Sequence, residues 1–158
     1  RREGEHERAL PLLDEGLAHF REFGDAEHVA WALYNRGLLA AGSGDHRAAS
    51  VALAECLDLR QEQDNVEPLV TTLAAIARVL AADDPATAAR LFGAVETLRA
   101  RHGCAAPVGE DGDAEQRTLA VIRERLGSAA HGELTAGCGL TLETAAQLAS
   151  TSLRREMS

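Results

Sequence analysis

The sequence predicts an all-α protein built from stacked helix pairs. Apolar residues recur at spacings of three and four along most of the chain, which places them on one face of a helix. Aromatic residues make up only 3% of the chain, β-branched residues are sparse, and no run alternates apolar and polar side chains with a period of two. Segments 45–57 and 84–95 are also similar in sequence, at a distance of 39 residues. In this alignment Ala49, Leu53 and Cys56 correspond to Ala88, Phe92 and Val95. Such a period is typical of helical repeats, which bury their apolar faces only against neighbouring units.

Five helices are expected before residue 103. The first, about 5–23, contains Pro11, which removes a backbone hydrogen bond, so either the regular helix begins near Ala9 or it is kinked. Asp25 and Asp84 are suitable N-caps for the second and fifth helices, and Pro85 fits the first position of the fifth. The predicted ranges of the later four helices are 26–41, 46–61, 66–82 and 85–101.

The repeat stops after residue 103. Residues 104–113 show no apolar period and are expected to form a loop. Further helices are expected at about 114–126 and 129–136, with a last one that begins after the N-cap Thr141 and carries Leu142, Ala145, Ala149 and Leu153. We therefore divide the chain into repeats over 1–103, with a truncated first unit, a loop over 104–113, and capping helices over 114–158. Terminal helices of this kind cover the last open apolar face of an array.

Composition limits the possible partners. The net charge is −9 and arginines are scattered among acidic residues, which argues against direct binding to nucleic acid, because phosphate backbones need a clustered basic surface. The three cysteines suggest no disulfide framework, which favours a reducing, cytoplasmic setting. No apolar run approaches the roughly 20 residues of a membrane-spanning helix. The chain contains no lysine and begins without methionine, as expected for a fragment of a longer bacterial protein.

The repeat resembles the tetratricopeptide family. Small and apolar residues occupy its expected positions in the second helices of the pairs, and Leu33, Gly37 and Ala40 match in a first helix. Thr72, Ile76 and Val79 form the partner set, with Ile76 in place of the usual small residue, and the units exceed the usual length of roughly 34 residues by about five. The resemblance implies a right-handed α-α superhelix with C-terminal capping helices.

A second resemblance involves the segments 88–99, 126–127 and 139–143. Together they look like the C-terminal tetratricopeptide region of bacterial signalling ATPases and LuxR-type transcriptional regulators. In such proteins the ATPase and the DNA-binding domain precede this region. The resemblance implies a sensor or protein-interaction module and carries over no active site.

The first helices of tetratricopeptide pairs line a concave groove. The side chains expected to face it are Trp31, Tyr34, Leu38, Val70, Leu73 and Ala77. Large rigid aromatics are favoured at binding hot spots, although Trp31 and Tyr34 could instead pack against neighbouring helices. Arg36 is a further candidate, because it occupies a normally apolar position; it could hold a ligand carboxylate, pair with a local acid such as Glu55, or reach solvent.

Neither a metal site nor an enzyme is predicted. His102, Cys104, His131 and Cys138 lack the paired spacings of structural zinc sites. The chain contains no nucleophile elbow, zinc-protease motif or phosphate-binding loop, and no cofactor is expected. The sequence thus favours a non-catalytic module of a larger bacterial transcriptional regulator, which binds a protein, a peptide or a small inducer and acts on upstream domains of the same chain. The alternative is a structural scaffold that mediates self-association, for example as a homodimer.

Overall fold

The fold consists of α-helices joined by short connections. The computed structural model describes residues 2–158, with side chains from Gly4 onward, so the start of the predicted 1–103 repeat region at Arg1 lies outside the described residues. The helices are α1 (Arg2–Glu22), α2 (Ala26–Gly42), α3 (His46–Glu62), α4 (Val66–Leu80), α5 (Pro85–His102), α6 (Gly109–Leu126), α7 (Ala130–Cys138) and α8 (Leu142–Met157), with a short 3-10 turn, η1 (Gly127–Ala129), before α7.

Side-chain caps explain where several of these helices begin. The carboxylates of Asp25, Asp45 and Asp84 accept hydrogen bonds from backbone N–H groups three residues ahead, at the starts of α2, α3 and α5. Each cap satisfies one N–H that the first turn of a helix leaves without a partner. Pro85 follows Asp84 at the first helical position, as the sequence predicted. At the start of α8, the hydroxyl of Thr141 forms a capping box with Thr144.

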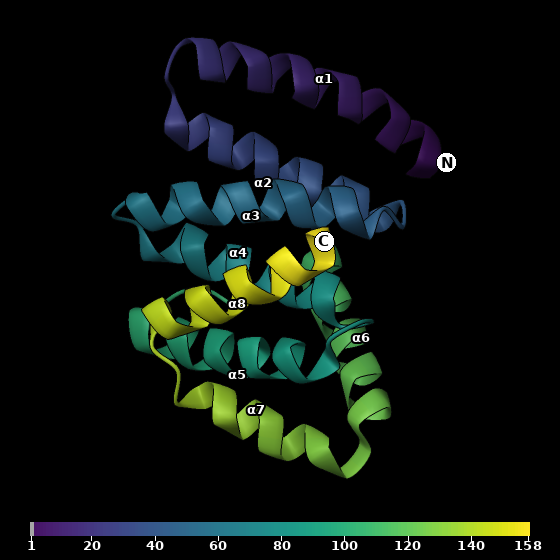
Figure 1. The fold of residues 1–158 in the computed structure, drawn as a ribbon, viewed down its shortest axis with the longest axis vertical. Helices are drawn as coiled ribbons and strands as arrows, with labels where there is room; N and C mark the ends of the chain where they lie inside the picture. Colours follow the sequence, from purple (N-terminus) through teal and green to yellow (C-terminus); the bar gives the residue numbers. More distant parts are fainter. Residues whose placement is uncertain (1) are drawn as a thin grey trace.

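Helices α1 to α5 stack in chain order (Figure 1). Helices α2 and α3 pack closely at Gly37, where an added Cβ would lie 2.7 Å from Cγ of Leu53. Leu53 is fully buried, so the glycine makes room for the largest side chain of that contact. The small residue of the predicted repeat pattern therefore sets how closely the two helices of the pair pack.

The core centres on α4. Nearly every residue from Leu69 to Leu80 is buried, because α3, α5 and α8 surround this helix on several sides. A second, smaller apolar cluster lies between α1, α2 and α3 and includes Leu17, Leu33 and Cys56. A helix that is apolar around most of its circumference belongs in the interior of a protein.

The first helix runs through Pro11. The helix begins at Arg2, so of the two alternatives for Pro11 a helical start near Ala9 is wrong. Pro11 lies on the exposed side of α1. Water can satisfy the backbone carbonyl that loses its partner there, which reduces the cost of a proline inside a helix.

The loop predicted over 104–113 is shorter than expected. Helix α6 begins at Gly109, whose φ of +64° is readily adopted only by glycine. Glu110 and Asp111 then place negative charge in the first turn, which favours the positive end of the helix dipole. The sequence shows no apolar period there because only Ala114, Glu115 and Ile122 of this helix are buried.

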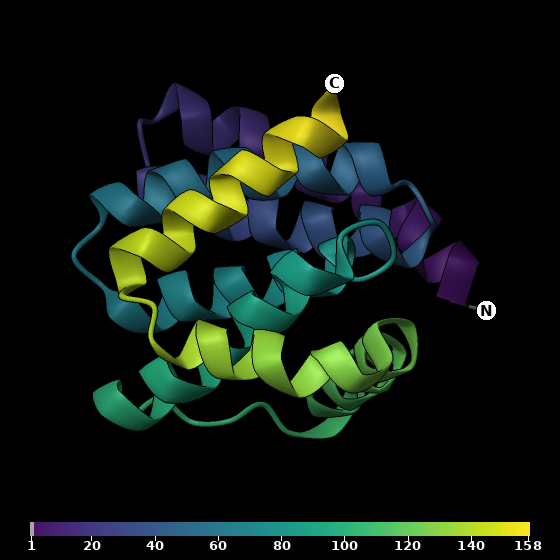
Figure 2. The same ribbon diagram turned by 60° about the horizontal axis from the view of Figure 1, so that its bottom comes forward.

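The C-terminal helices cover two different surfaces. Helix α7 packs on α5, the last helix of the repeat, as expected for a cap. Helix α8 instead turns back and lies across α3, α4 and α5 (Figure 2). Its buried residues include the predicted Ala145, Ala149 and Leu153, so the predicted apolar face is confirmed. That face packs on α3, α4 and α5, however, and not on the open end of the array as expected. No described helix is long and apolar enough to cross a membrane.

Candidate functional site

A groove follows one face of α2. Trp31, Tyr34 and Leu38 lie at spacings of three and four residues, so their side chains share that face. Trp31 is 51% exposed, whereas Tyr34 and Leu38 are half-buried. Three cavities of about 350, 140 and 790 Å³ are lined by Trp31, Tyr34 and Leu38 respectively, and the last two cavities also share Arg78 and Asp111. These three predicted residues therefore lie along one hollowed surface.

Helices α4 and α6 form the other walls of the groove. From α4 come Thr71 and Arg78, one face of a helix that is otherwise largely buried. The connection before α6 contributes Pro107, and α6 itself contributes Asp111 and Glu115. The groove is thus completed by an element outside the repeat.

Two ion pairs fix α6 against the repeat helices. The guanidinium of Arg99 on α5 donates to both carboxylate oxygens of Glu115, at 2.8 and 3.0 Å, and both side chains are mostly buried. Arg78 of α4 lies 3.8 Å from the carboxylate of Asp111, which is well exposed. The bidentate, shielded pair holds α6 more firmly than the exposed pair, because solvent screens exposed charges.

Tyr34 is a hydrogen-bond donor at neutral pH. Burial raises the pKa of its hydroxyl, the negative charge of Asp111 raises it further, and Arg78 and Arg60 oppose the rise. The guanidinium carbon of Arg60 lies 5.0 Å from the centre of the Tyr34 ring, within the range of a cation–π contact. The ring is thereby held in place while its hydroxyl stays protonated.

Three of the predicted groove residues lie elsewhere. Val70, Leu73 and Ala77 are 0–1% exposed and belong to the core around α4. Their expected orientation toward the groove is therefore wrong. The groove face of α4 is offset by one residue, to Thr71 and Arg78, since α5 and α8 pack against the more apolar sides of the helix.

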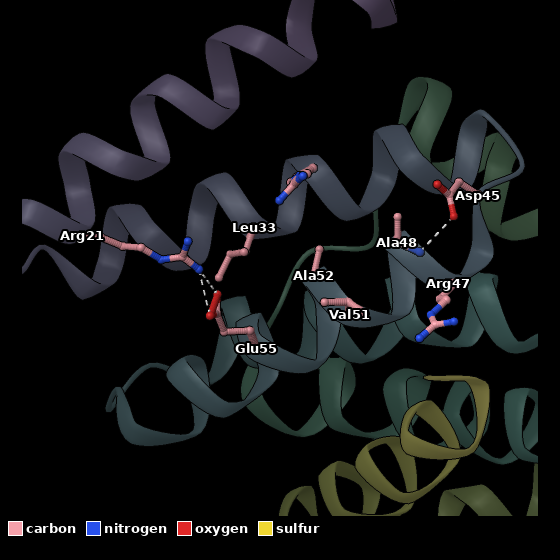
Figure 3. A pocket seen from close by; sticks show the side chains of 9 residues that line it. Arg21, Leu33, Asp45, Arg47, Ala48, Val51, Ala52 and Glu55 are labelled. Atoms are coloured by element: carbon pink, nitrogen blue, oxygen red, sulfur yellow. Dashed lines mark hydrogen bonds and ion pairs between the residues drawn. The ribbon is translucent and has the colours of Figure 1, made fainter. Parts of the chain in front are cut away.

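Arg36 also faces away from the groove. It lies near the opposite side of α2 from Trp31, and its Nε is 3.2 Å from the carboxylate of Asp14 on α1. It lines a separate cleft of about 370 Å³ between α1, α2 and α3 (Figure 3). The predicted partner Glu55 instead pairs with Arg21, at 2.5 Å. Arg36 thus pairs with a local acid, as one of the three alternatives stated, but the partner is Asp14 and not Glu55.

One signal in the sequence could have identified the groove face of α4. Glu67, Thr71 and Arg78 are spaced by four and seven residues, so these polar residues lie on one side of an otherwise apolar helix. No comparable signal points to α6, whose place depends on the Arg99–Glu115 pair between two distant helices.

The groove offers a binding surface of mixed chemistry. Among the described residues, no three His, Cys, Asp or Glu side chains lie close enough to hold a metal ion. Aromatic, aliphatic, amide and charged side chains line the cavities together, as is usual where a peptide or small molecule binds. The arrangement can bury an aromatic or aliphatic side chain and hydrogen-bond a backbone.

Comparison with known families identifies the repeat. Residues 1–62 match the family model for the tetratricopeptide repeat, which covers α1 to α3. Comparisons with curated proteins and with solved structures gave no match. The match confirms the tetratricopeptide resemblance for this part of the chain, whereas similarity to the C-terminal regions of LuxR-type regulators stays a prediction. Tetratricopeptide repeats suggest a protein-interaction module, and the chain has an all-α, tetratricopeptide-like fold.

Proposed function

We propose that the groove along α2 binds an extended peptide segment of a partner protein. The observation that carries this proposal is the exposed indole of Trp31, in line with Tyr34 and Leu38 along these cavities. A half-exposed tryptophan on a rigid helix can bury a large area on binding with little loss of side-chain entropy. Asn35 and Thr71 line the same groove and can hydrogen-bond a peptide backbone.

The broader setting follows from the resemblances in the sequence. We propose that the chain is the interaction or ligand-sensing part of a larger bacterial transcriptional regulator, located in the cytoplasm. Occupancy of the groove would then favour one state of upstream ATPase and DNA-binding domains. A ligand can shift such an equilibrium only by its difference in affinity for the two states.

Peptide selection tests the groove. We expect a library of random peptides to yield binders of the wild-type chain that lose binding to the Trp31→Ala variant. Val51→Ala is the matched control, since Val51 is also 51% exposed but lies in the cleft between α1, α2 and α3. Far-UV circular dichroism should show the same helical melting curve for both variants. Peptides that bind both variants equally well would contradict the proposal.

Self-association is the second candidate function. Leu12 of α1 and Phe23, directly after α1, are 69% and 81% exposed and offer apolar surface to a second copy of the chain. We expect a scaffold to form oligomers whose mass by light scattering rises with concentration, without any ligand. Leu12→Ser should then lower that mass, whereas a monomer at all concentrations would exclude this function.

A further inference from the structure

The cavity around Trp31 has an unusual charge arrangement. It measures about 350 Å³ and lies at the end of the groove, where α2 meets the connection from α3 to α4. Arg60 and Gln63 from the end of α3 line it, as do Glu27 of α2 and Asp64 of the connection. The volume is at the low end for small-molecule sites, which measure roughly 300–1,000 Å³, and suits a ligand of amino-acid size.

Arg60 is a buried cation without an acid. Its side chain is only 8% exposed, and no described carboxylate lies within ion-pair distance of it. One terminal nitrogen donates to the backbone oxygen of Pro68 at 3.0 Å and to the hydroxyl of Thr72 at 2.7 Å. The other guanidinium nitrogens make no hydrogen bond within the described chain. A buried charge normally requires a counter-charge, so this cavity is complementary to an anionic group.

Two neighbouring groups also lack partners. Nε2 of Gln63 is buried and has no hydrogen-bond acceptor among the described residues. Helix α4 begins beside the cavity, and its N-cap Asn65 makes no side-chain capping bond; because Pro68 has no N–H, the donors of this first turn are the N–H groups of Val66 and Glu67. Amide donors, a helix N-terminus and a guanidinium together form a suitable environment for a carboxylate.

The rim of the cavity carries the opposite charge. Glu27 and Asp64 are exposed and have no ion-pair partner among the described residues. A purely anionic ligand would be repelled at this rim, whereas a ligand with a neighbouring ammonium group would be attracted. Trp31 and Pro68 supply apolar surface in the same cavity.

We propose that this cavity binds a free α-amino acid. The carboxylate of the ligand approaches Arg60 and Gln63, the ammonium group faces Glu27 and Asp64, and the side chain packs on Trp31. The inference goes beyond the proposed function, since it requires no peptide in the rest of the groove. It also differs from recognition of a peptide end, because a peptide end carries only one of the two charged groups.

The fluorescence of Trp31 tests this inference directly, because it is the only tryptophan of the chain. The chain is titrated separately with each of the twenty common L-amino acids. The highest concentration is about 10 mM, ten times a dissociation constant of about 1 mM, so that binding of this affinity would come close to saturation. We expect at least one to give a saturable change. Its N-acetyl and amide derivatives should each bind at least tenfold more weakly, because each lacks one charge. No saturation by any amino acid, or equal binding of either derivative, overturns the proposal.

Substitutions separate the ligand contacts from the fold. Arg60 is unsuitable, because its hydrogen bonds hold α3 to α4. We expect Gln63→Met and Asp64→Asn each to weaken binding about tenfold, with Asp58→Asn on the exposed side of α3 as the neutral control. Gln63→Met should leave the urea midpoint unchanged or higher, since it removes an unpartnered buried amide. Unchanged affinity in either variant would overturn the contact assigned to that residue.

Discussion

The contact between α5 and α7 allows a sharp test of the packing, because glycines bring the two backbones together. A Cβ added at Gly137 would lie 2.7 Å from the carbonyl carbon of Arg90 and 2.8 Å from its Cα. From the other side, a Cβ at Gly93 would lie 3.0 Å from the carbonyl carbon of Leu134. Real Cβ atoms essentially never come closer than 3.0 Å to such neighbours, and backbone atoms cannot turn aside. Either substitution to alanine should therefore force the helices apart.

The size of the effect follows from comparing Gly137 with Gly132. An added Cβ at Gly132, on the same helix, has nothing within 4 Å. Glycine to alanine favours helix formation by up to about 1 kcal/mol at either position. Only Gly137→Ala also adds a steric cost, about 1–3 kcal/mol for an overpacked contact. The difference in unfolding free energy between the two variants isolates that cost.

Urea unfolding followed by far-UV circular dichroism measures this difference. Thermal unfolding measures the same difference as a melting temperature. For a chain of this size, each kcal/mol of unfolding free energy corresponds to about 2–4 °C, so Gly137→Ala should melt roughly 2–12 °C below Gly132→Ala. Combining Gly93→Ala with Gly137→Ala should cost less than the sum of the two, since helices already separated accommodate the second methyl group. Equal stability of the Gly132 and Gly137 variants would refute the close α5–α7 contact.

Two further predictions concern the core and the pH dependence. Gly37→Ala and Leu53→Ala should each destabilise the chain, the second by about 2–5 kcal/mol. The double variant should lose less than the sum of the two, because the added methyl group occupies space left by the leucine. Strict additivity of the unfolding free energies in urea would contradict this. Burial, followed by the charge and hydrogen bond of Asp83, raises the pKa of Glu156 in the folded state, so its favourable contribution is present below the unfolded pKa and is lost as pH rises through the folded pKa. Glu156→Gln should therefore be more stable than wild type at pH 7, with the advantage disappearing toward about pH 4; a difference in unfolding free energy that does not change with pH would refute the assigned environment.

The positions of helices could be predicted largely from local signals. The starts of α2 and α5 matched because Asp25 and Asp84 are local caps whose effect does not depend on the rest of the fold. The interior of α4 was harder, since an apolar stripe identifies buried residues but not which neighbour buries them. Val70 and Leu73 were assigned to the groove because first helices of tetratricopeptide pairs line it, yet they pack in the core, on a helix that is covered on nearly every side.

The C-terminal helices show where local signals end. Helix α8 was expected from its apolar stripe, but that stripe fits the open end of the array and the surface over α3, α4 and α5 equally well. The beginning of α6 was missed because a glycine followed by acidic residues is also typical of a loop. Only the structure shows that Gly109 has a positive φ and that Glu110 and Asp111 lie in the first turn of a helix. The error for α8 concerns the choice among partners far apart in sequence, which periodicity does not encode.

Arg60 shows the same limit for the candidate ligand site. In the sequence it is a basic residue in the last turn of a helix, a position where positive charge is favourable and usually solvated. Only the packed structure reveals that it is buried, that it lines the same cavity as Trp31 and Gln63, and that it has no ion-pair partner among the described residues. Within the described chain Arg60 is held by hydrogen bonds to Pro68 and Thr72 and by its contact with the Tyr34 ring. Glu27 and Asp64 line the same cavity, and neither forms an ion pair with it among the described residues. The separation of these charges across a cavity, instead of their neutralisation within the fold, is what favours a ligand with one charge of each sign.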